Sequence, residues 1–212
     1  AAWDNVTVFL RKKGYKDNEI EQTGLIIKGR LGYYDRFRHR LMFTLKDHRG
    51  NIVGFSGRTL TADIKEAKYI NSPETVLYHK SKMLFGLDVT KDAIKKEGKV
   101  ILCEGEFDVL SSYQAGISNI VAVKGTAITV DQLQLLKRIT SELLLALDMD
   151  IAGDAAARRG IELAESLDFN VKIIRLTSGK DLDEAVQQNP PEVKKAIKHA
   201  VSVYDFIIDS AL

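Results

Sequence analysis

Two aspartates one residue apart, Asp148 and Asp150, follow the apolar run at residues 143–147. In an extended chain alternate side chains point the same way, so these two carboxylates face one direction. Two carboxylates about 4 Å apart repel each other by roughly 4 kcal/mol at an effective dielectric constant near 20. A shared proton, a basic neighbour or a divalent cation must therefore offset this repulsion.

Four more carboxylates occupy similar positions along the second half of the chain. Each lies at the end of a segment that we expect to be a strand or shortly after it, and they are Glu104, Asp108, Asp181 and Asp183. An Asp near the start of a helix is common as an N-cap, so Asp108 or Asp183 alone has a plain structural explanation. The whole set at one edge of one sheet does not, because the charges would repel each other. Oxygen ligands with no neighbouring His or Cys indicate Mg²⁺ or Mn²⁺.

The elements that position these carboxylates alternate between strand and helix from residue 99 onward. Apolar runs predict strands at 99–105, 119–125, 142–148 and 170–176, with helices predicted at 108–116, 129–139 and 153–168 between them. This alternation is typical of βαβ units, which form a parallel sheet covered by helices on both faces. Sites in such sheets lie at the carboxyl ends of the strands, where the six carboxylates are expected.

The sequence of the first half of the chain predicts a different arrangement of helices and strands. Residues 3–14 form a plausible short helix, and residues 41–45 and 52–55 predict a β-hairpin with a turn at 47–50.

The two halves of the chain differ in charge. Residues 1–98 contain 19 Lys and Arg against 12 Asp and Glu, a net charge of +7, whereas residues 99–212 contain 12 Lys and Arg against 17 Asp and Glu, a net charge of −5. A basic half joined to an acidic half suits one part that binds a polyanion and another that binds cations, although two ordinary solvated surfaces would give the same counts.

Composition excludes several classes of protein. The single cysteine, Cys103, excludes a disulfide framework and a cysteine-rich zinc site, and the four histidines show no ligand spacing. No apolar stretch approaches the length of a membrane span, and the first residues do not form a secretion signal. We therefore expect a protein of the reducing cytoplasm without a membrane contact. The sequence starts without Met, so we expect a fragment of a longer chain.

Three local segments only partly match known calcium or phosphate loops. Residues 148–159 begin like a calcium loop, but Ala152 and Arg159 stand where oxygen ligands are required. Residues 124–127 and 178–181 each contain part of a phosphate loop, but both lack its upstream glycine and its Lys-Ser/Thr pair. Neither reading is retained.

The acidic strand ends and the basic first half together resemble the Toprim domain of primases, topoisomerases and some nucleases. The similarity is closer to the bacterial replicative primase family, and it covers residues 34–184. Eight segments follow one another in that family's order: YDRFRHRLMF (34–43), RGNIVGFSGRTL (49–60), KYINSPET (68–75), YHKSKMLFGL (78–87), EGEFDVL (104–110), KGTAIT (124–129), DMDIAG (148–153) and GKDLDE (179–184).

The resemblance implies roles for individual residues. Glu104 corresponds to the Toprim glutamate, and Asp148 and Asp150 to its metal-binding aspartates, so these three are the implied catalytic residues. Asp108, Asp181 and Asp183 match further acidic positions of a site that holds two or more Mg²⁺ or Mn²⁺ ions. The implied nucleotide- and template-binding residues are Arg58, Lys68, Asn71 and Lys80, with Arg36 and Arg38 as weaker candidates.

The chain also departs from the family pattern. Met149 and Ile151 stand where Gly and Arg are usual, Glu106-Phe107 replaces a Tyr-Met pair, and Ser56 replaces Gly. These changes keep every carboxylate. The missing positive charge at Ile151 is expected to affect substrate affinity more than the chemistry of the reaction.

We therefore expect an α/β protein, α+β overall, in which a Toprim-like parallel sheet is flanked by helices. A smaller mixed α/β subdomain with a β-hairpin precedes the sheet, and C-terminal helices follow it. The expected domains are a basic subdomain at 1–98, the metal-binding Toprim domain at 99–184 and a helical segment at 185–212. No zinc site is expected here, because the family's zinc-binding module needs a Cys/His cluster.

The expected function is the synthesis of short RNA primers on a single-stranded DNA template from nucleoside triphosphates. The resemblance also implies a replicative helicase as a partner, through a region absent from this sequence, and we expect a monomer. A Toprim-type nuclease, a haloacid-dehalogenase-type phosphatase with Asp148 as nucleophile, and a DNA-binding module with an inactive acidic site are the alternatives. The phosphatase reading leaves Glu104 without a role. Cation binding separates the enzymes from the inactive module.

Overall fold

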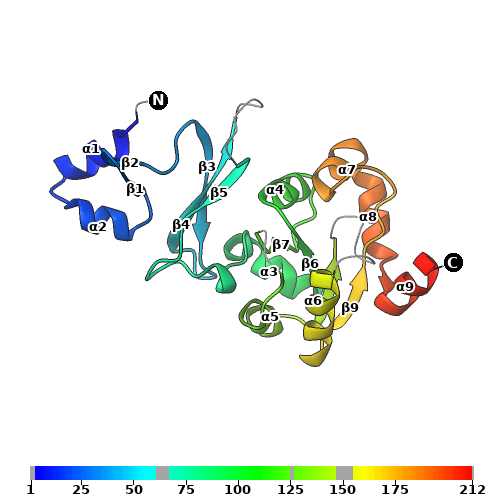
Figure 1. Cartoon of the computed structure of the whole chain (residues 1–212). Coiled ribbons are helices and arrows are strands. Elements are labelled where there is room, and N and C mark those ends of the chain that lie inside the picture. The colour runs from blue at the N-terminus through cyan, green and yellow to red at the C-terminus, as the bar shows by residue number, and fades with distance from the viewer. Residues whose placement is uncertain (1–2, 61–66, 125–126, 147–154, 212) are drawn as a thin grey trace. The chain divides into compact units, whose positions relative to one another are not determined.

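The computed structural model describes residues 3–60, 67–124, 127–146 and 155–211 (Figure 1). The chain divides into two compact units, one formed by Ala1–Lys46 and Asn51–Lys80 and the other by Asp47–Gly50 and Ser81–Leu212. Helices and strands are mixed, and one sheet is largely parallel, which confirms the predicted fold class. In the described ranges, no helix combines the length and the apolar character needed to cross a membrane.

In the residues described, the first unit combines two short helices with two antiparallel sheets. Strand β1 pairs with β2, and the second sheet has the order β3-β4-β5. The predicted hairpin is present as β3 and β4, and both strands run longer than predicted. The elements are α1 (Asn5–Lys12), α2 (Asp17–Gln22), β1 (Ile26–Gly29), β2 (Gly32–Asp35), β3 (Arg40–Lys46), β4 (Ile52–Thr59) and β5 (Tyr69–Asn71), followed by the 3₁₀ turn η1 (Lys80–Lys82).

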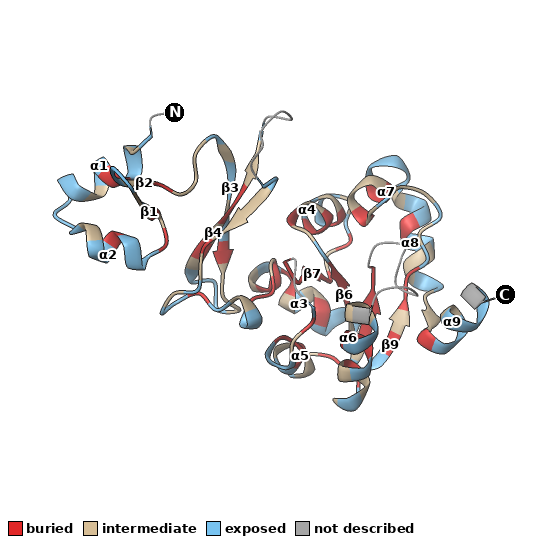
Figure 2. Ribbon diagram, in the orientation of Figure 1, coloured by how far each residue is buried: buried red, intermediate tan, exposed pale blue. Residues whose placement is uncertain are grey.

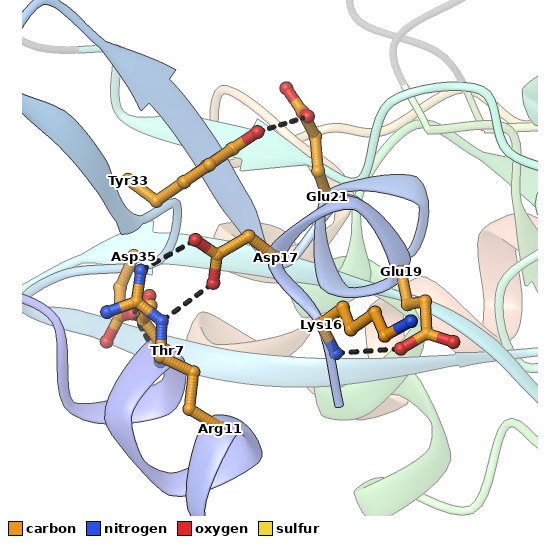
Figure 3. Close-up of polar contacts among 8 residues, drawn as sticks. All are labelled: Thr7, Arg11, Lys16, Asp17, Glu19, Glu21, Tyr33 and Asp35. Carbon is orange, nitrogen blue, oxygen red and sulfur yellow. Dashed lines mark hydrogen bonds and ion pairs between the residues drawn. The ribbon is translucent and has the colours of Figure 1, made fainter. Parts of the chain in front are cut away.

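A buried carboxylate fixes the start of α1 on this unit. Asp35, the last residue of β2, accepts hydrogen bonds from the backbone N–H groups of Val6 and Thr7 at 2.7 and 3.0 Å, and from the Thr7 hydroxyl at 2.8 Å. The first N–H groups of a helix have no partner within the helix, so Asp35 satisfies two of them. Arg11 donates two hydrogen bonds to Asp17 at 2.7 and 2.9 Å, and these connect α1 to α2 (Figure 3).

The second unit is an α/β layer structure. Helices α4, α5 and α6 lie between the parallel strands in the chain, as the alternation predicts, and α7, α8 and α9 follow the last of these strands. The elements are α3 (Leu87–Glu97), β6 (Lys99–Cys103), α4 (Glu106–Gln114), β7 (Ile120–Ala122), α5 (Val130–Lys137), β8 (Glu142–Leu145), α6 (Ala155–Ser166), β9 (Asn170–Ile173), α7 (Leu182–Gln188), α8 (Pro190–Lys198), β10 (Val201–Ser202) and α9 (Val203–Ala211).

The sheet of this unit has the order β10-β9-β8-β6-β7. Strands β6, β7, β8 and β9 are parallel, with Leu102 opposite both Val121 and Leu145. Strand β10 adds to the edge of β9 in the antiparallel direction, and the sequence did not predict it. Because β6, β8 and β9 are neighbours, the segments that leave their carboxyl ends start from adjacent positions.

Helices cover both faces of this sheet, as expected for a parallel sheet (Figure 1). Alternate residues of β6 enter two different cores: Val100 and Leu102 pack with α3, α5 and α6, whereas Ile101 and Cys103 pack with α4, α7 and α8. The strands are therefore buried on both sides (Figure 2). Burial raises the pKa of the Cys103 thiol, which agrees with an apolar packing role.

Candidate functional site

The predicted acidic segments leave three adjacent strands at the same edge of the parallel sheet. Glu104 directly follows β6 and is exposed, and Asp181 and Asp183 lie at the start of α7, after β9. The strand between them, β8, leads into residues 147–154. Asp148 and Asp150 belong to this segment and lie outside the described residues. The order of β6, β8 and β9 thus supports the expectation that these segments share one edge.

Asp108 connects two of these segments through its carboxylate. One oxygen accepts a hydrogen bond from the backbone N–H of Gly105 at 2.9 Å, and the other accepts one from the backbone N–H of Asp183, also at 2.9 Å. Both donors belong to helix N-termini, where N–H groups lack partners and negative charge is favoured. The structure therefore brings Asp108 directly against the start of α7.

Burial dominates the electrostatics of Asp108, and neighbouring negative charge adds to its effect. Burial raises the pKa of this carboxyl to about 6, the two backbone hydrogen bonds oppose the rise, and the charges of Asp181 and Asp183 add to it. Asp181 caps α7 by accepting a hydrogen bond from the Glu184 N–H at 2.9 Å. A cation near these three carboxylates would relieve their repulsion.

The chemistry of these donors fits a hard divalent cation. Glu104, Asp181 and Asp183 offer only carboxylate oxygens, the ligands preferred by Mg²⁺ and Mn²⁺. Across residues 3–60, 67–124, 127–146 and 155–211, however, no three His, Cys, Asp or Glu side chains are grouped closely enough to hold a metal ion. A site at this edge would need donors from residues 147–154, where Asp148 and Asp150 are expected to serve.

Two of the predicted nucleic-acid-binding residues share one face of the sheet in the first unit. Asn71 on β5 lies opposite Ser56 on β4, and Arg58 is two residues further along β4. Side chains two residues apart on a strand face the same way, so Arg58 and Asn71 lie on the same side. Arg58 stacks on Tyr69, with 5.6 Å between the guanidinium carbon and the ring centre.

Asn71 also has an unused acceptor. Its side-chain oxygen is buried and has no hydrogen-bond partner among the residues that the structure describes, and the same holds for the hydroxyl of Ser56. Buried polar atoms are nearly always paired with protein, water or ligand. Both atoms lie on the side of the sheet that Arg58 also faces, and both are closed off from solvent.

The remaining basic residues differ in their surroundings. Lys68 is exposed just before β5, and Lys80 is half-buried at the start of η1. Arg36 is half-buried, and this burial lowers the pKa of its guanidinium. The Arg38 guanidinium carbon lies 4.3 Å from the ring centre of Trp3 and 4.8 Å from that of Tyr34.

A buried ion pair at the carboxyl edge was missed by the sequence analysis. Glu106, the first residue of α4, contacts the ammonium group of Lys124, which follows β7. The two residues are 18 positions apart, so no local spacing relates them. The only signal was that Glu106 departs from the family pattern.

Comparisons with known proteins found a matching family for each half of the chain. The family "DNA primase catalytic core, N-terminal domain" matches residues 1–91, and the family "Toprim-like" matches residues 101–186. The RNA polymerase domain of the Mycobacterium tuberculosis primase DnaG is 33% identical with a TM-score of 0.85, over 100% of this chain and 71% of that chain. This chain belongs to the DnaG-type DNA primase family.

Other members of the primase family are similar over the same length. A DNA primase from Clostridium acetobutylicum is 40% identical over 99% of this chain, which spans 35% of that relative's length. A DnaG primase catalytic domain solved bound to ssDNA is 32% identical with a TM-score of 0.85, over 100% of this chain and 67% of that chain. The predicted family is therefore confirmed.

Proposed function

We propose that this chain contains the nucleotidyl-transfer site of a bacterial primase, which joins nucleoside triphosphates into short RNA primers on single-stranded DNA. The main support is the alignment of the whole chain with the RNA polymerase domain of a DnaG primase. The acidic segments that follow β6, β8 and β9 agree with a metal-dependent reaction.

The carboxyl-terminal edge of the parallel sheet, where Glu104, Asp148, Asp150, Asp181 and Asp183 are expected, would hold the cations of this reaction. Two or more Mg²⁺ or Mn²⁺ ions, when bound, supply charge stabilisation for the attacking and leaving oxygens of an in-line displacement at the α-phosphate. We assign Glu104, Asp148 and Asp150 to the first ion and Asp181 and Asp183 to the second. Asp108, a further candidate ligand, uses its oxygens to orient the starts of α4 and α7.

The basic residues of the first unit would hold the template and the incoming nucleotide. We assign phosphate contacts to Arg58 and Lys80, and a base or sugar contact to Asn71. Lys68, Arg36 and Arg38 would add positive charge. The ssDNA in the related DnaG catalytic domain supports a single-stranded template for this chain. Phosphate contacts of this kind bind strands largely independently of sequence.

Arg58→Ala is expected to weaken binding of a single-stranded oligonucleotide several-fold in 50 mM salt. Loss of one phosphate contact should also reduce the slope of log affinity against log salt by about 0.7. Fluorescence anisotropy of a labelled oligonucleotide across a salt series measures both. Lys28→Ala is the matched control, because Lys28 is an exposed cation on β1, in the other sheet of the same unit. An unchanged slope in Arg58→Ala would remove the phosphate contact from the assignment.

Phosphodiester hydrolysis is the second candidate function, because Toprim sites also occur in nucleases. The match of residues 1–91 to the N-terminal domain of a primase catalytic core favours synthesis. We also propose the cytoplasm as the compartment of this protein and the replicative helicase as a partner of the longer protein. The proposed domains are residues 1–98, 99–184 and 185–212.

A primer-synthesis assay on single-stranded DNA separates the two reactions. With Mg²⁺ or Mn²⁺ and all four ribonucleoside triphosphates, we expect short RNA products. No products should form when EDTA is present from the start of the reaction. Shortening of an end-labelled DNA strand without RNA products would instead favour the nuclease.

A further inference from the structure

Glu74 is an exposed carboxylate in the loop that leads from β5 to η1. Its side chain is 64% exposed, and the loop belongs to the first unit, whose basic residues we assign to the template and the nucleotide. An exposed negative charge weakens the attraction between a protein and the phosphates of a nucleic acid. The carboxylate of Glu74 therefore needs a reason that outweighs its charge.

The loop is anchored to strand β4 near both of its ends. The backbone N–H of Ser72 donates to the Phe55 carbonyl at 2.8 Å, and the Ser72 hydroxyl accepts from the Phe55 N–H at 3.0 Å. Tyr78 is only 1% exposed, and its ring lies so close to Gly54 that a Cβ there would be 3.2 Å from it. The Thr75 hydroxyl accepts the Tyr78 N–H at 2.9 Å. These contacts hold the backbone of the loop in place.

Glu74 connects the start of this loop to Lys80 at its end. One carboxylate oxygen accepts a hydrogen bond from the backbone N–H of Lys80 at 2.8 Å, and the other lies 3.2 Å from Nδ1 of His79. A hydrogen bond to an ionised acceptor is stronger than one between neutral groups. Glu74 therefore orients the backbone from which the Lys80 side chain starts.

The Lys80 ammonium group forms no hydrogen bond or ion pair with the residues that the structure describes. Glu74 thus holds the backbone of Lys80 and leaves its charge available to a ligand. A lysine side chain is flexible, and binding a phosphate costs part of its conformational freedom. A backbone that is already oriented narrows the region that the ammonium group samples, which lowers this cost.

We propose that Glu74 is a positioning residue for Lys80, whose backbone it orients so that the ammonium group meets a phosphate of the template strand. The inference rests on the proposed function, which assigns a phosphate contact to Lys80. Glu74 acts only through Lys80 and does not touch the strand itself. Its removal should therefore weaken DNA binding, although the loss of a negative charge alone would strengthen it.

The test measures the affinity of this chain for a labelled single-stranded oligonucleotide by fluorescence anisotropy across a salt series. Glu74→Ala is expected to weaken binding about threefold in about 50 mM salt and to reduce the slope of log affinity against log salt by up to about 0.7, the value of one phosphate contact. Glu74→Gln should bind within about twofold of the wild type, because its amide oxygen can still accept the Lys80 N–H.

A double-mutant cycle shows whether Glu74 acts through Lys80. In a Lys80→Ala background, Glu74→Ala should weaken binding no further, since the group that it positions is gone. Glu21→Ala is the control for removing a carboxylate from the same unit, because Glu21 lies on α2 and accepts a hydrogen bond from the Tyr33 hydroxyl. This control should bind as tightly as the wild type or slightly more tightly.

Unchanged or stronger binding by Glu74→Ala, with Lys80→Ala weakened, would overturn the positioning role and leave the proposed function standing. Equal losses from Glu74→Ala with and without Lys80 would overturn it as well, and so would a lower free energy of unfolding in urea with an unchanged salt slope. If Glu74→Ala does not fold, Glu74→Ser replaces it with the same expected results. Unchanged binding by Lys80→Ala would instead remove the phosphate contact of Lys80 from the proposed function, and the inference with it.

Discussion

Asp148→Asn is expected to reduce primer synthesis by at least about 100-fold while DNA binding changes less than about threefold. The substitution keeps the size of the side chain and removes the charge that would hold a cation. A loss of about 3 kcal/mol of transition-state stabilisation corresponds to this factor, since each 1.36 kcal/mol is tenfold in rate. The measurement is the initial rate of RNA synthesis on a single-stranded template, with binding followed by anisotropy.

Glu142→Gln is the matched control, because it removes a carboxylate from the other end of β8. It should retain the wild-type rate. A parallel loss of synthesis and DNA binding in Asp148→Asn would contradict a role restricted to the cation site. Full activity in Asp148→Asn would remove this residue from the reaction.

Leu102→Ala is expected to destabilise the chain by about 2–5 kcal/mol, because truncating a fully buried Leu leaves a cavity. Leu102 is 0% exposed and lies in β6, which has β7 and β8 as neighbours. For a chain of this size the melting temperature should fall by about 10 °C. Urea and thermal unfolding followed by circular dichroism measure both effects.

Val89→Ala is the comparison for this core substitution. Val89 is 58% exposed on α3, so its truncation should change the free energy of unfolding by less than about 0.5 kcal/mol. A loss below 1 kcal/mol for Leu102→Ala would show that the sheet tolerates the cavity and that β6 is not held by this packing.

The parallel sheet could be predicted because its strands are continuous apolar runs, such as 143–145 in β8, and its helices have regular lengths. Strand β10 was missed because two residues, Val201 and Ser202, are too few to show a period. Strands β1 and β2 were also missed, since each has four residues and they meet at glycines. Short strands depend on their partners rather than on their own sequence.

What could be predicted of the candidate site is which acidic residues follow which described strands: Glu104 follows β6, and Asp181 and Asp183 follow β9. The resemblance supplied their identities, and the order of β6, β8 and β9 supports their common edge. The double hydrogen bonding of Asp108 and the contact between Glu106 and Lys124 were not predictable. Both depend on how helix N-termini and loops meet in three dimensions, which the spacing of residues along the chain does not encode.

The most direct test of a metal-dependent acidic edge is anomalous diffraction from crystals of this chain soaked in Mn²⁺, with and without a nucleoside triphosphate. We expect anomalous peaks beside Glu104, Asp148 and Asp150, and a further peak beside Asp181 and Asp183 when the triphosphate is bound. The absence of any peak at this edge in millimolar Mn²⁺, with the triphosphate visible in the same crystal, would contradict metal-dependent nucleotidyl transfer by these carboxylates.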